Sequence, residues 1–248
     1  MEKEYYKAYY HLERKHWWFL ARSIILQKKI EQFLPKKDGL KILNVGAATG
    51  GTSQMLEQFG AVTSVEYDRD CFTFLKGILS SDVIHGSITE LPFNDSQFDL
   101  VCGFDVLEHV QDDKLAMQEL TRVTKQNGVV FVTVPAFQSL WSSHDDVNHH
   151  FRRYSKGGLL ELIKSLNVKR EYLTFFNFFL FPPIALFRYL FGKKKSDFSK
   201  KKSDFHKVER IGKLNGLLFW IFKFESIFIN ANLRFPIGVS LMLITKKE

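Results

Sequence analysis

A glycine-rich turn constrains the possible folds of this chain more than any other feature. The seven residues Asn44-Val45-Gly46-Ala47-Ala48-Thr49-Gly50 follow the strand-like run 40–43 and precede the helix-like run 52–59. Such a turn presents backbone N–H groups near the positive end of a helix, which suits an anionic group of a nucleotide-like cofactor. A glycine turn after a strand also occurs where it serves tight packing alone, so downstream residues must decide between the two interpretations.

Glu66 lies where a second cofactor contact is expected. The next strand-like run, Ala61–Val65, ends in Glu66 about twenty residues after the turn. An acidic side chain at this position can accept hydrogen bonds from both hydroxyls of a ribose. The alternative is a solvated carboxylate at a strand end, and the spacing favours the ribose contact.

The order of apolar segments predicts an α/β fold. Strands are expected at residues 41–45, 61–66, 82–85, 98–103, 129–134, 169–175 and 238–245. Helices are expected at residues 5–34, 52–59, 69–79, 112–124 and 156–166. Strands that alternate with helices in this way predict a doubly wound parallel sheet.

Several motifs, taken in order, resemble those of class I S-adenosylmethionine-dependent methyltransferases of the small-molecule type. They are Ile42–Gly50, Glu66, Gly86–Ile88 ahead of Leu91-Pro92-Phe93, Phe98–Val101 and Val106–Val110. The resemblance implies a Rossmann-like seven-stranded methyltransferase sheet with an antiparallel final hairpin. It also implies S-adenosylmethionine as the cofactor and S-adenosylhomocysteine as the product.

The resemblance assigns cofactor contacts to residues after the strands. The expected cofactor-binding residues are Asn44, Gly46, Ala47, Ala48, Gly50, Glu66, Tyr67, Ser87, Ile88, Phe104 and Asp105. Three positions depart from the family: Asn44 replaces an acid, Ala48 replaces the middle glycine, and Ser87 stands where an acid is frequent. Because Asn44 carries no charge to pair with the amino group of the cofactor, a non-catalytic cofactor-binding scaffold remains an alternative.

The segment after the strand at 129–134 supplies candidates for acceptor chemistry. His150 or His144, oriented by Asp145, could accept the proton of an attacking hydroxyl, so these three are the candidate catalytic residues. The expected substrate-binding residues are Trp18, His109, Trp141, Arg152, Arg153 and Tyr154, with the arginines suited to a phosphate, pyrophosphate or carboxylate. The alternative is that Asp145 and Arg153 form a buried ion pair that holds the loop. His149 is treated as incidental.

The pattern Trp-Ser-x-His-Asp followed by His-x-Arg-Arg-Tyr resembles a subgroup associated with surface-glycan and lipid-linked saccharide pathways, as does Glu13–Arg22. It implies O-methylation of a small or lipid-linked acceptor, with a saccharide among the candidates. The expected organisation is a single domain, 1–248. Its parts are an N-terminal helical lid at 1–38, a cofactor-binding core at 39–175, a helical aromatic and basic insertion at 176–236, and the last strand at 237–248.

A metal-dependent reaction is a second enzymatic interpretation. Asp105, Glu108 and His109 resemble a metal-associated motif of the ubiquinone-pathway O-methyltransferases, in which the ion would bind a phenolate or polarise a hydroxyl. The Leu-Glu-His sequence also occurs widely in metal-free relatives. We therefore expect no metal, and keep a phenol or quinone-precursor methyltransferase as the alternative.

The net charge of +8 is concentrated in one segment. Residues 193–213 hold nine Lys or Arg against three Asp or Glu, between aromatic-rich runs at 175–191 and 217–229. Neither run has the roughly 20 uninterrupted apolar residues of a spanning helix. Peripheral membrane contact through 176–229 and a soluble cap or dimer interface are both open. Nucleic acid is not expected as a partner, because no RNA-binding module accompanies the lysines.

The two cysteines and the N-terminus indicate a compartment. Cys71 and Cys102 lie in apolar surroundings and form no disulfide or zinc pattern. The first residues contain no apolar run of signal-peptide length. We therefore expect a cytoplasmic protein, with membrane contact confined to the inner face. The sequence leaves the oligomeric state open.

Overall fold

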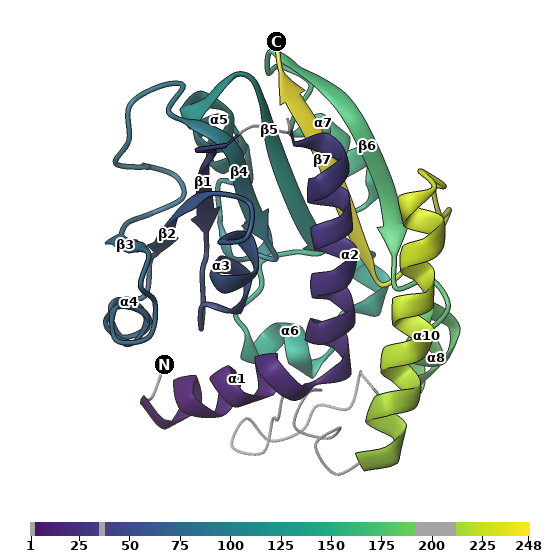
Figure 1. Cartoon of the computed structure of the whole chain (residues 1–248). Coiled ribbons are helices and arrows are strands. Elements are labelled where there is room, and N and C mark those ends of the chain that lie inside the picture. The colour runs from purple at the N-terminus through teal and green to yellow at the C-terminus, as the bar shows by residue number, and fades with distance from the viewer. Residues whose placement is uncertain (1–2, 35–37, 192–211) are drawn as a thin grey trace.

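A seven-stranded sheet forms the centre of the computed structural model, which describes residues 3–34, 38–191 and 212–248 (Figure 1). The strands are β1 (Lys41–Val45), β2 (Ala61–Glu66), β3 (Asp82–His85), β4 (Phe98–Phe104), β5 (Thr124–Pro135), β6 (Val168–Phe176) and β7 (Ser240–Lys247). Their order in the sheet is β3-β2-β1-β4-β5-β7-β6. Strand β7 is antiparallel to both of its neighbours, β5 and β6, and the other neighbouring strands are parallel to each other. This confirms the predicted doubly wound sheet with an antiparallel final hairpin.

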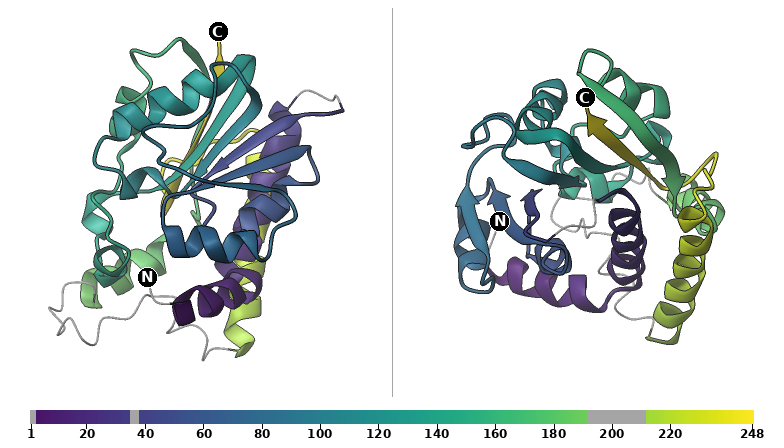
Figure 2. Two further views of the ribbon diagram at one scale, coloured as in Figure 1. Left: turned by 90° about the vertical axis from the view of Figure 1, so that its left-hand side faces the viewer. Right: turned by 45° about the horizontal axis from the view of Figure 1, so that its top comes forward.

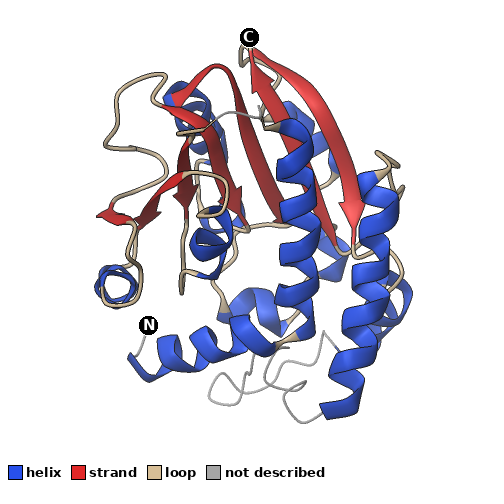
Figure 3. Ribbon diagram, viewed as in Figure 1, coloured by secondary structure: helices blue, strands red, loops and turns tan. Residues whose placement is uncertain are grey.

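The helices cover both faces of the sheet (Figure 3). They are α1 (Lys3–Lys15), α2 (Trp17–Phe33), α3 (Gly51–Leu56), α4 (Arg69–Lys76), α5 (Asp113–Val123), α6 (Ser143–Val147), α7 (Lys156–Glu161), α8 (Phe181–Phe191) and α10 (Gly212–Asn230). Short 3-10 turns lie at Leu107–His109 and Gln138–Leu140. Several starts have a side-chain cap; Asp68, for example, accepts from the first backbone N–H groups of α4.

Two apolar clusters sandwich the sheet, because side chains alternate along each strand. On β5, Val130 and Val132 pack with α5 and α7 on one face. Val129 and Phe131 pack with α2, α3 and α10 on the other. The sheet is therefore buried on both sides, as a parallel sheet requires.

The N-terminal and insertion segments contribute to the core, which the sequence did not predict. Helix α10 packs along α2 over one face of the sheet (Figure 2). Phe222 and Ile229 of α10 are fully buried. The predicted insertion at 176–236 thus supplies part of the helical layer. Within the predicted lid at 1–38, α2 also belongs to that layer, and only α1 lies across the carboxyl ends of the strands (Figure 1). The turn between them is made at His16, whose imidazole accepts from the Trp18 N–H at the start of α2.

Two other expectations concern membranes and cysteines. In the part of the chain that the structure describes, no helix combines the length and apolarity needed to cross a bilayer. Residues 193–211 of the basic segment lie outside the described residues. Cys71 and Cys102 are buried and unpaired with each other.

We expect the stability of the fold to depend on the protonation of Glu225 in α10. This side chain is fully buried, its Oε2 accepts from the Phe178 N–H at 2.8 Å, and burial raises its pKa from 4.5 to about 8. The pKa of Glu225 is higher in the folded chain than in the unfolded chain. The protonated carboxyl therefore makes its full contribution to stability below about pH 4.5, and that contribution is lost as the pH rises through about 8. Each pKa unit between the folded and unfolded states corresponds to about 1.4 kcal/mol in the free energy of unfolding.

Denaturant unfolding should therefore show Glu225→Gln about as stable as the unchanged chain near pH 5 and more stable, by a few kcal/mol, near about pH 9. Glu57, an exposed glutamate at the end of α3, supplies the matched variant Glu57→Gln. If the unchanged chain and Glu225→Gln respond to pH in the same way, the buried carboxyl does not titrate as described.

Candidate active site

A cavity of about 1230 Å³ lies beyond the carboxyl ends of β1, β2 and β4. Its wall includes residues of α1, α2, the glycine turn, the segments after β2 and β4, and the loop after α6. Ligand sites in open α/β sheets form at this edge. Since small-molecule sites usually enclose about 300–1,000 Å³, the volume suffices for a cofactor together with an acceptor.

The glycine turn and Glu66 form one end of the cavity. Gly46 has a φ of +74°, and a Cβ there would lie 2.7 Å from Val106 Cγ2, so only glycine fits. The Glu66 carboxylate accepts from the backbone N–H of Ala48 and of Asp68, each at 3.0 Å. Burial raises the pKa of Glu66 although these hydrogen bonds oppose the change. The carboxylate is therefore fixed at the cavity wall.

Asp105, directly after β4, is held by an arginine from α2. Its backbone has a φ of +53°. Its Oδ2 lies 2.6 Å from Arg22 Nη2, and its Oδ1 accepts from the Thr133 hydroxyl at 3.1 Å. Arg22 is itself buried, and its Nε has no hydrogen-bond partner among the described residues. An ion pair thus forms part of the cavity wall, which both residues line.

His150 is oriented by a buried carboxylate. Asp145 Oδ1 lies 2.9 Å from His150 Nδ1, while Arg153 donates to both Asp145 oxygens at 2.7 and 3.0 Å. Burial alone would raise the pKa of Asp145, but the hydrogen bond from His150 and the Arg153 guanidinium outweigh it and hold that pKa well below its usual range. An ionised Asp145 keeps the His150 proton on Nδ1 and leaves Nε2 as the acceptor atom.

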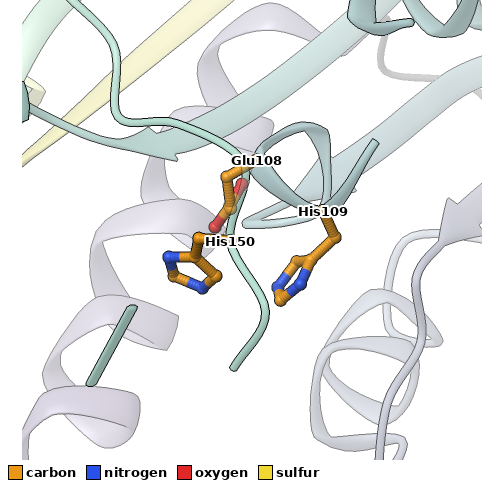
Figure 4. A group of neighbouring side chains, drawn as sticks. All are labelled: Glu108, His109 and His150. Carbon is orange, nitrogen blue, oxygen red and sulfur yellow. The ribbon is translucent and has the colours of Figure 1, made fainter. Parts of the chain in front are cut away.

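Glu108, His109 and His150 converge on one point of the cavity wall (Figure 4). Their ligand atoms all lie within 4.8 Å of one another. Glu108 is buried, its Oε2 has no hydrogen-bond partner among the described residues, and burial beside Asp105 raises its pKa well above the usual value. The His109 ring is exposed to the cavity, and desolvation by the surrounding protein atoms, together with the neighbouring His150, lowers its pKa to about 4.

The structure brings most of the predicted site residues to this cavity. Those that line it are Trp18, Gly46, Ala47, Ala48, Glu66, Tyr67, Ser87, Ile88, Phe104, Asp105, His109, His144, His150 and Arg153. Those that do not line it are Asn44, Gly50, Trp141, Asp145, Arg152 and Tyr154. Exposed His149 is also absent from the wall, as expected.

Two of the predicted cofactor-binding residues, Asn44 and Gly50, do not line the cavity. Asn44 is buried, and its amide donates to Thr52 Oγ1 and Ser53 Oγ, both at 2.9 Å. It therefore ties β1 to the start of α3, and the prediction of a direct cofactor contact is not supported. Gly50 precedes α3 with a φ of +85°, where a Cβ would press on Leu75 and Leu79. Its role is to shape the turn.

The arginines do not provide the predicted anion site. Both oxygens of Asp145 already engage Arg153, whose side chain is 2% exposed. Arg152 pairs with Asp113 at 2.8 Å and donates to the Gln111 carbonyl. The structure therefore shows the buried ion pair of the alternative interpretation, and the Arg152 guanidinium, 32% exposed, already has two protein partners.

Two aromatic predictions are corrected in the same way. The Tyr154 hydroxyl bonds to the Leu107 carbonyl and to Asp113 inside the core. The Trp141 indole donates to Asp146. Both rings support the loop that carries His150 and make no contact with the cavity.

The part of the chain that forms much of this cavity is similar to known proteins. Residues 43–132 match a family model described as a methyltransferase domain, and this range contains the turn, Glu66, Asp105 and β4. This range of the chain is therefore similar to a methyltransferase domain.

Curated proteins similar to this chain include methyltransferases. A probable S-adenosylmethionine-dependent methyltransferase of Mycolicibacterium smegmatis is 24% identical over 64% of this chain and 62% of its own length. Demethylmenaquinone methyltransferase of Staphylococcus aureus is 29% identical over 48% of this chain and 55% of its own length. The chain therefore spans little more than half the length of these curated relatives. A Thermotoga maritima structure described as a possible histamine N-methyltransferase shares the fold at a TM-score of 0.60, 14% identity, and 99% and 96% coverage of the two chains.

S-adenosylmethionine is the cofactor that the family match and the relatives indicate, and the residues present suit it. Glu66 would hold the ribose hydroxyls, and Ser87 and Ile88 would contact the adenine. The ion pair of Asp105 and Arg22 presents one charge of each sign, which suits the amino and carboxyl groups of the methionine part.

Sequence reasoning missed two residues that line the cavity, Glu13 and Arg22. Glu13 of α1 accepts from the Thr49 hydroxyl at 2.5 Å and from the Gly51 N–H at 3.1 Å, which fastens α1 to the glycine turn. Both residues lie within the Glu13–Arg22 motif that resembles the subgroup. The signal that could have found Arg22 is its place among apolar residues of α2, where a lone charge needs a buried partner.

Proposed function

We propose that this chain transfers a methyl group from S-adenosylmethionine to a hydroxyl oxygen of a small or lipid-linked acceptor, with a saccharide as the candidate. The observation that carries the proposal is the hydrogen bond between Asp145 and His150 at the wall of the cavity. It fixes an imidazole whose Nε2 has no hydrogen-bond partner among the described residues, in the same cavity as the glycine turn and Glu66. An acceptor hydroxyl next to this atom can lose its proton as it attacks.

The chemistry needs little from the protein besides orientation and one proton acceptor. The cofactor supplies an electrophilic methyl group on a sulfonium, whose carbon–sulfur bond electrons remain on the sulfur of S-adenosylhomocysteine. His150 Nε2 takes the hydroxyl proton as the new carbon–oxygen bond forms. Asp145 stabilises the resulting imidazolium, and Arg153 keeps Asp145 ionised and in place.

Methyl transfer from labelled S-adenosylmethionine into an extract of the host tests this function. The extract is separated into membrane lipid, soluble small-molecule and RNA fractions. Label in the lipid or the small-molecule fraction is the expected result and identifies the acceptor class. Label confined to RNA would contradict the proposed acceptor, and cofactor binding without label in any fraction would favour the non-catalytic scaffold.

A metal-dependent phenol or quinone-precursor methyltransferase is a second candidate, favoured by Glu108, His109 and His150. These three offer one carboxylate oxygen and two imidazole nitrogens within 4.8 Å, and Asp145 supports His150 as carboxylates support metal-binding histidines. The predicted ligand Asp105 is not part of this group, because Arg22 engages its carboxylate. In this candidate His150 binds the ion and does not take the proton.

Chelation separates the two candidates. The hydroxyl methyltransferase should keep its activity after dialysis against a chelator, with no stoichiometric metal found by elemental analysis. Loss of activity that a divalent ion restores, together with loss of bound metal in Glu108→Gln, would establish the metal-dependent candidate instead.

A further inference from the structure

Exposed large apolar side chains gather on α8 and α10. Of the fifteen such side chains among the described residues, nine belong to these two helices. They are Leu186, Phe187, Tyr189 and Leu190 on α8 and Leu214, Leu217, Trp220, Phe224 and Ile227 on α10. Single exposed apolar residues are ordinary, but a gathering of this kind marks an interaction site. We call these nine residues the α8–α10 face.

Helix α10 has two different apolar sides. Phe222 and Ile229 point into the core with Glu225. Leu217, Trp220, Phe224 and Ile227 follow a spacing of three and four residues, so they form one stripe on the outer side. Trp220 is 62% exposed and Ile227 58% exposed. More than half of each of these side chains is exposed, so the outer stripe leaves a large apolar area outside the packing of α10 on α2.

The charges on the two helices have one sign at the surface. Helix α8 contains Arg188 and no acidic residue, and in α10 the charged side chains that the structure describes are Lys223 and Glu225. Glu225 is buried, and its raised pKa keeps it largely protonated near neutral pH. Lys223 Nζ lies 4.5 Å from the centre of the Trp220 ring, which places a cation beside the largest exposed aromatic side chain.

The sequence that joins the helices carries charge of the same sign, with nine Lys or Arg and three Asp or Glu over residues 193–213. Most of that segment lies outside the described residues, and the α8–α10 face is defined without it.

We propose that the α8–α10 face is a peripheral docking surface for an anionic lipid bilayer. Aromatic and aliphatic side chains enter the acyl boundary while lysines remain at the headgroups, a division that this face reproduces. A second copy of the chain fits less well, because two copies of a surface with cations and no exposed acid repel one another. A spanning arrangement is not available to these helices, as the absence of a long apolar helix in the described residues shows.

The cavity reaches this face. Phe187 of α8 and Leu214 of α10 are exposed members of the face and also line the cavity, together with Ile184 and Leu218 from the same helices. A bilayer bound here would therefore lie against the apolar end of the cavity. This continuity connects the docking surface with the place where an acceptor would enter.

Vesicle flotation tests the docking surface without any methyl transfer. The unchanged chain should float with vesicles of phosphatidylcholine and phosphatidylglycerol and remain largely unbound with phosphatidylcholine alone. Trp220→Ser combined with Phe224→Ser should reduce partitioning about tenfold or more, because each ring loses its apolar transfer free energy. Lys223→Glu should reduce binding to the anionic vesicles while leaving every apolar side chain in place.

Tyr67→Ser is the matched control, since Tyr67 is a 75% exposed aromatic residue after β2. It should bind vesicles like the unchanged chain. Equal binding to neutral and anionic vesicles, or equal binding by Trp220→Ser/Phe224→Ser and Tyr67→Ser, would overturn the proposal. A dimer in light scattering that these two serines dissociate, without vesicle binding, would assign the face to contact between copies.

Discussion

Replacement of His150 by alanine is expected to lower the kcat of methyl transfer by about a hundredfold or more, with little change in the affinity for S-adenosylmethionine. A positioned general base contributes about 10²- to 10⁴-fold to a rate. His150 is the imidazole that a buried carboxylate orients, through the 2.9 Å contact with Asp145. Steady-state kinetics with the acceptor found in the labelling experiment measure the effect.

His149→Ala is the matched control for this prediction. His149 is the adjacent imidazole, but it is exposed and does not line the cavity. The control should retain the activity of the unchanged chain. Comparable kcat values for His150→Ala and His149→Ala would show that another group takes the proton.

Replacement of Glu66 by alanine is expected to weaken the affinity for S-adenosylmethionine by about 10- to 100-fold. A hydrogen bond to a charged group contributes on the order of 1.5–3 kcal/mol, and Glu66 is the carboxylate that the fold holds at the end of β2. Calorimetric titration measures the change in Kd.

Glu57→Ala removes the same charge from an exposed position at the end of α3 and should bind the cofactor normally. Thermal unfolding of both variants separates a lost ribose contact from a damaged turn, because Glu66 also accepts from the Ala48 N–H. Normal affinity in a folded Glu66→Ala would place the ribose elsewhere in the cavity.

The strands and the glycine turn could be predicted because their signals are local. Apolar runs of strand length, separated by turn residues, gave all seven strands within a few residues. The turn needs glycine at Gly46 for a reason contained in its own backbone, a positive φ. The largest difference is in β5, which begins at Thr124, where the sequence predicted the end of a helix.

The missed features depend on contacts between distant segments. The partner of Asp105 is Arg22, which precedes it by more than eighty positions in the chain and reaches it from α2. Arg153 pairs with Asp145 because that carboxylate is buried in the folded loop. The sequence does not show that burial. The aromatic segment at 217–229 predicted a surface, yet one side of α10 packs in the core because α2 lies beside it. Periodicity alone does not show which side of an apolar helix finds a partner.

Calorimetric titration of the unchanged chain with S-adenosylmethionine tests the central claim most directly. The account predicts saturable binding of one cofactor per chain, displaced by S-adenosylhomocysteine and weakened by Glu66→Ala. A folded chain that binds neither compound would contradict the assignment of this cavity as a cofactor site, and with it the proposed methyl transfer.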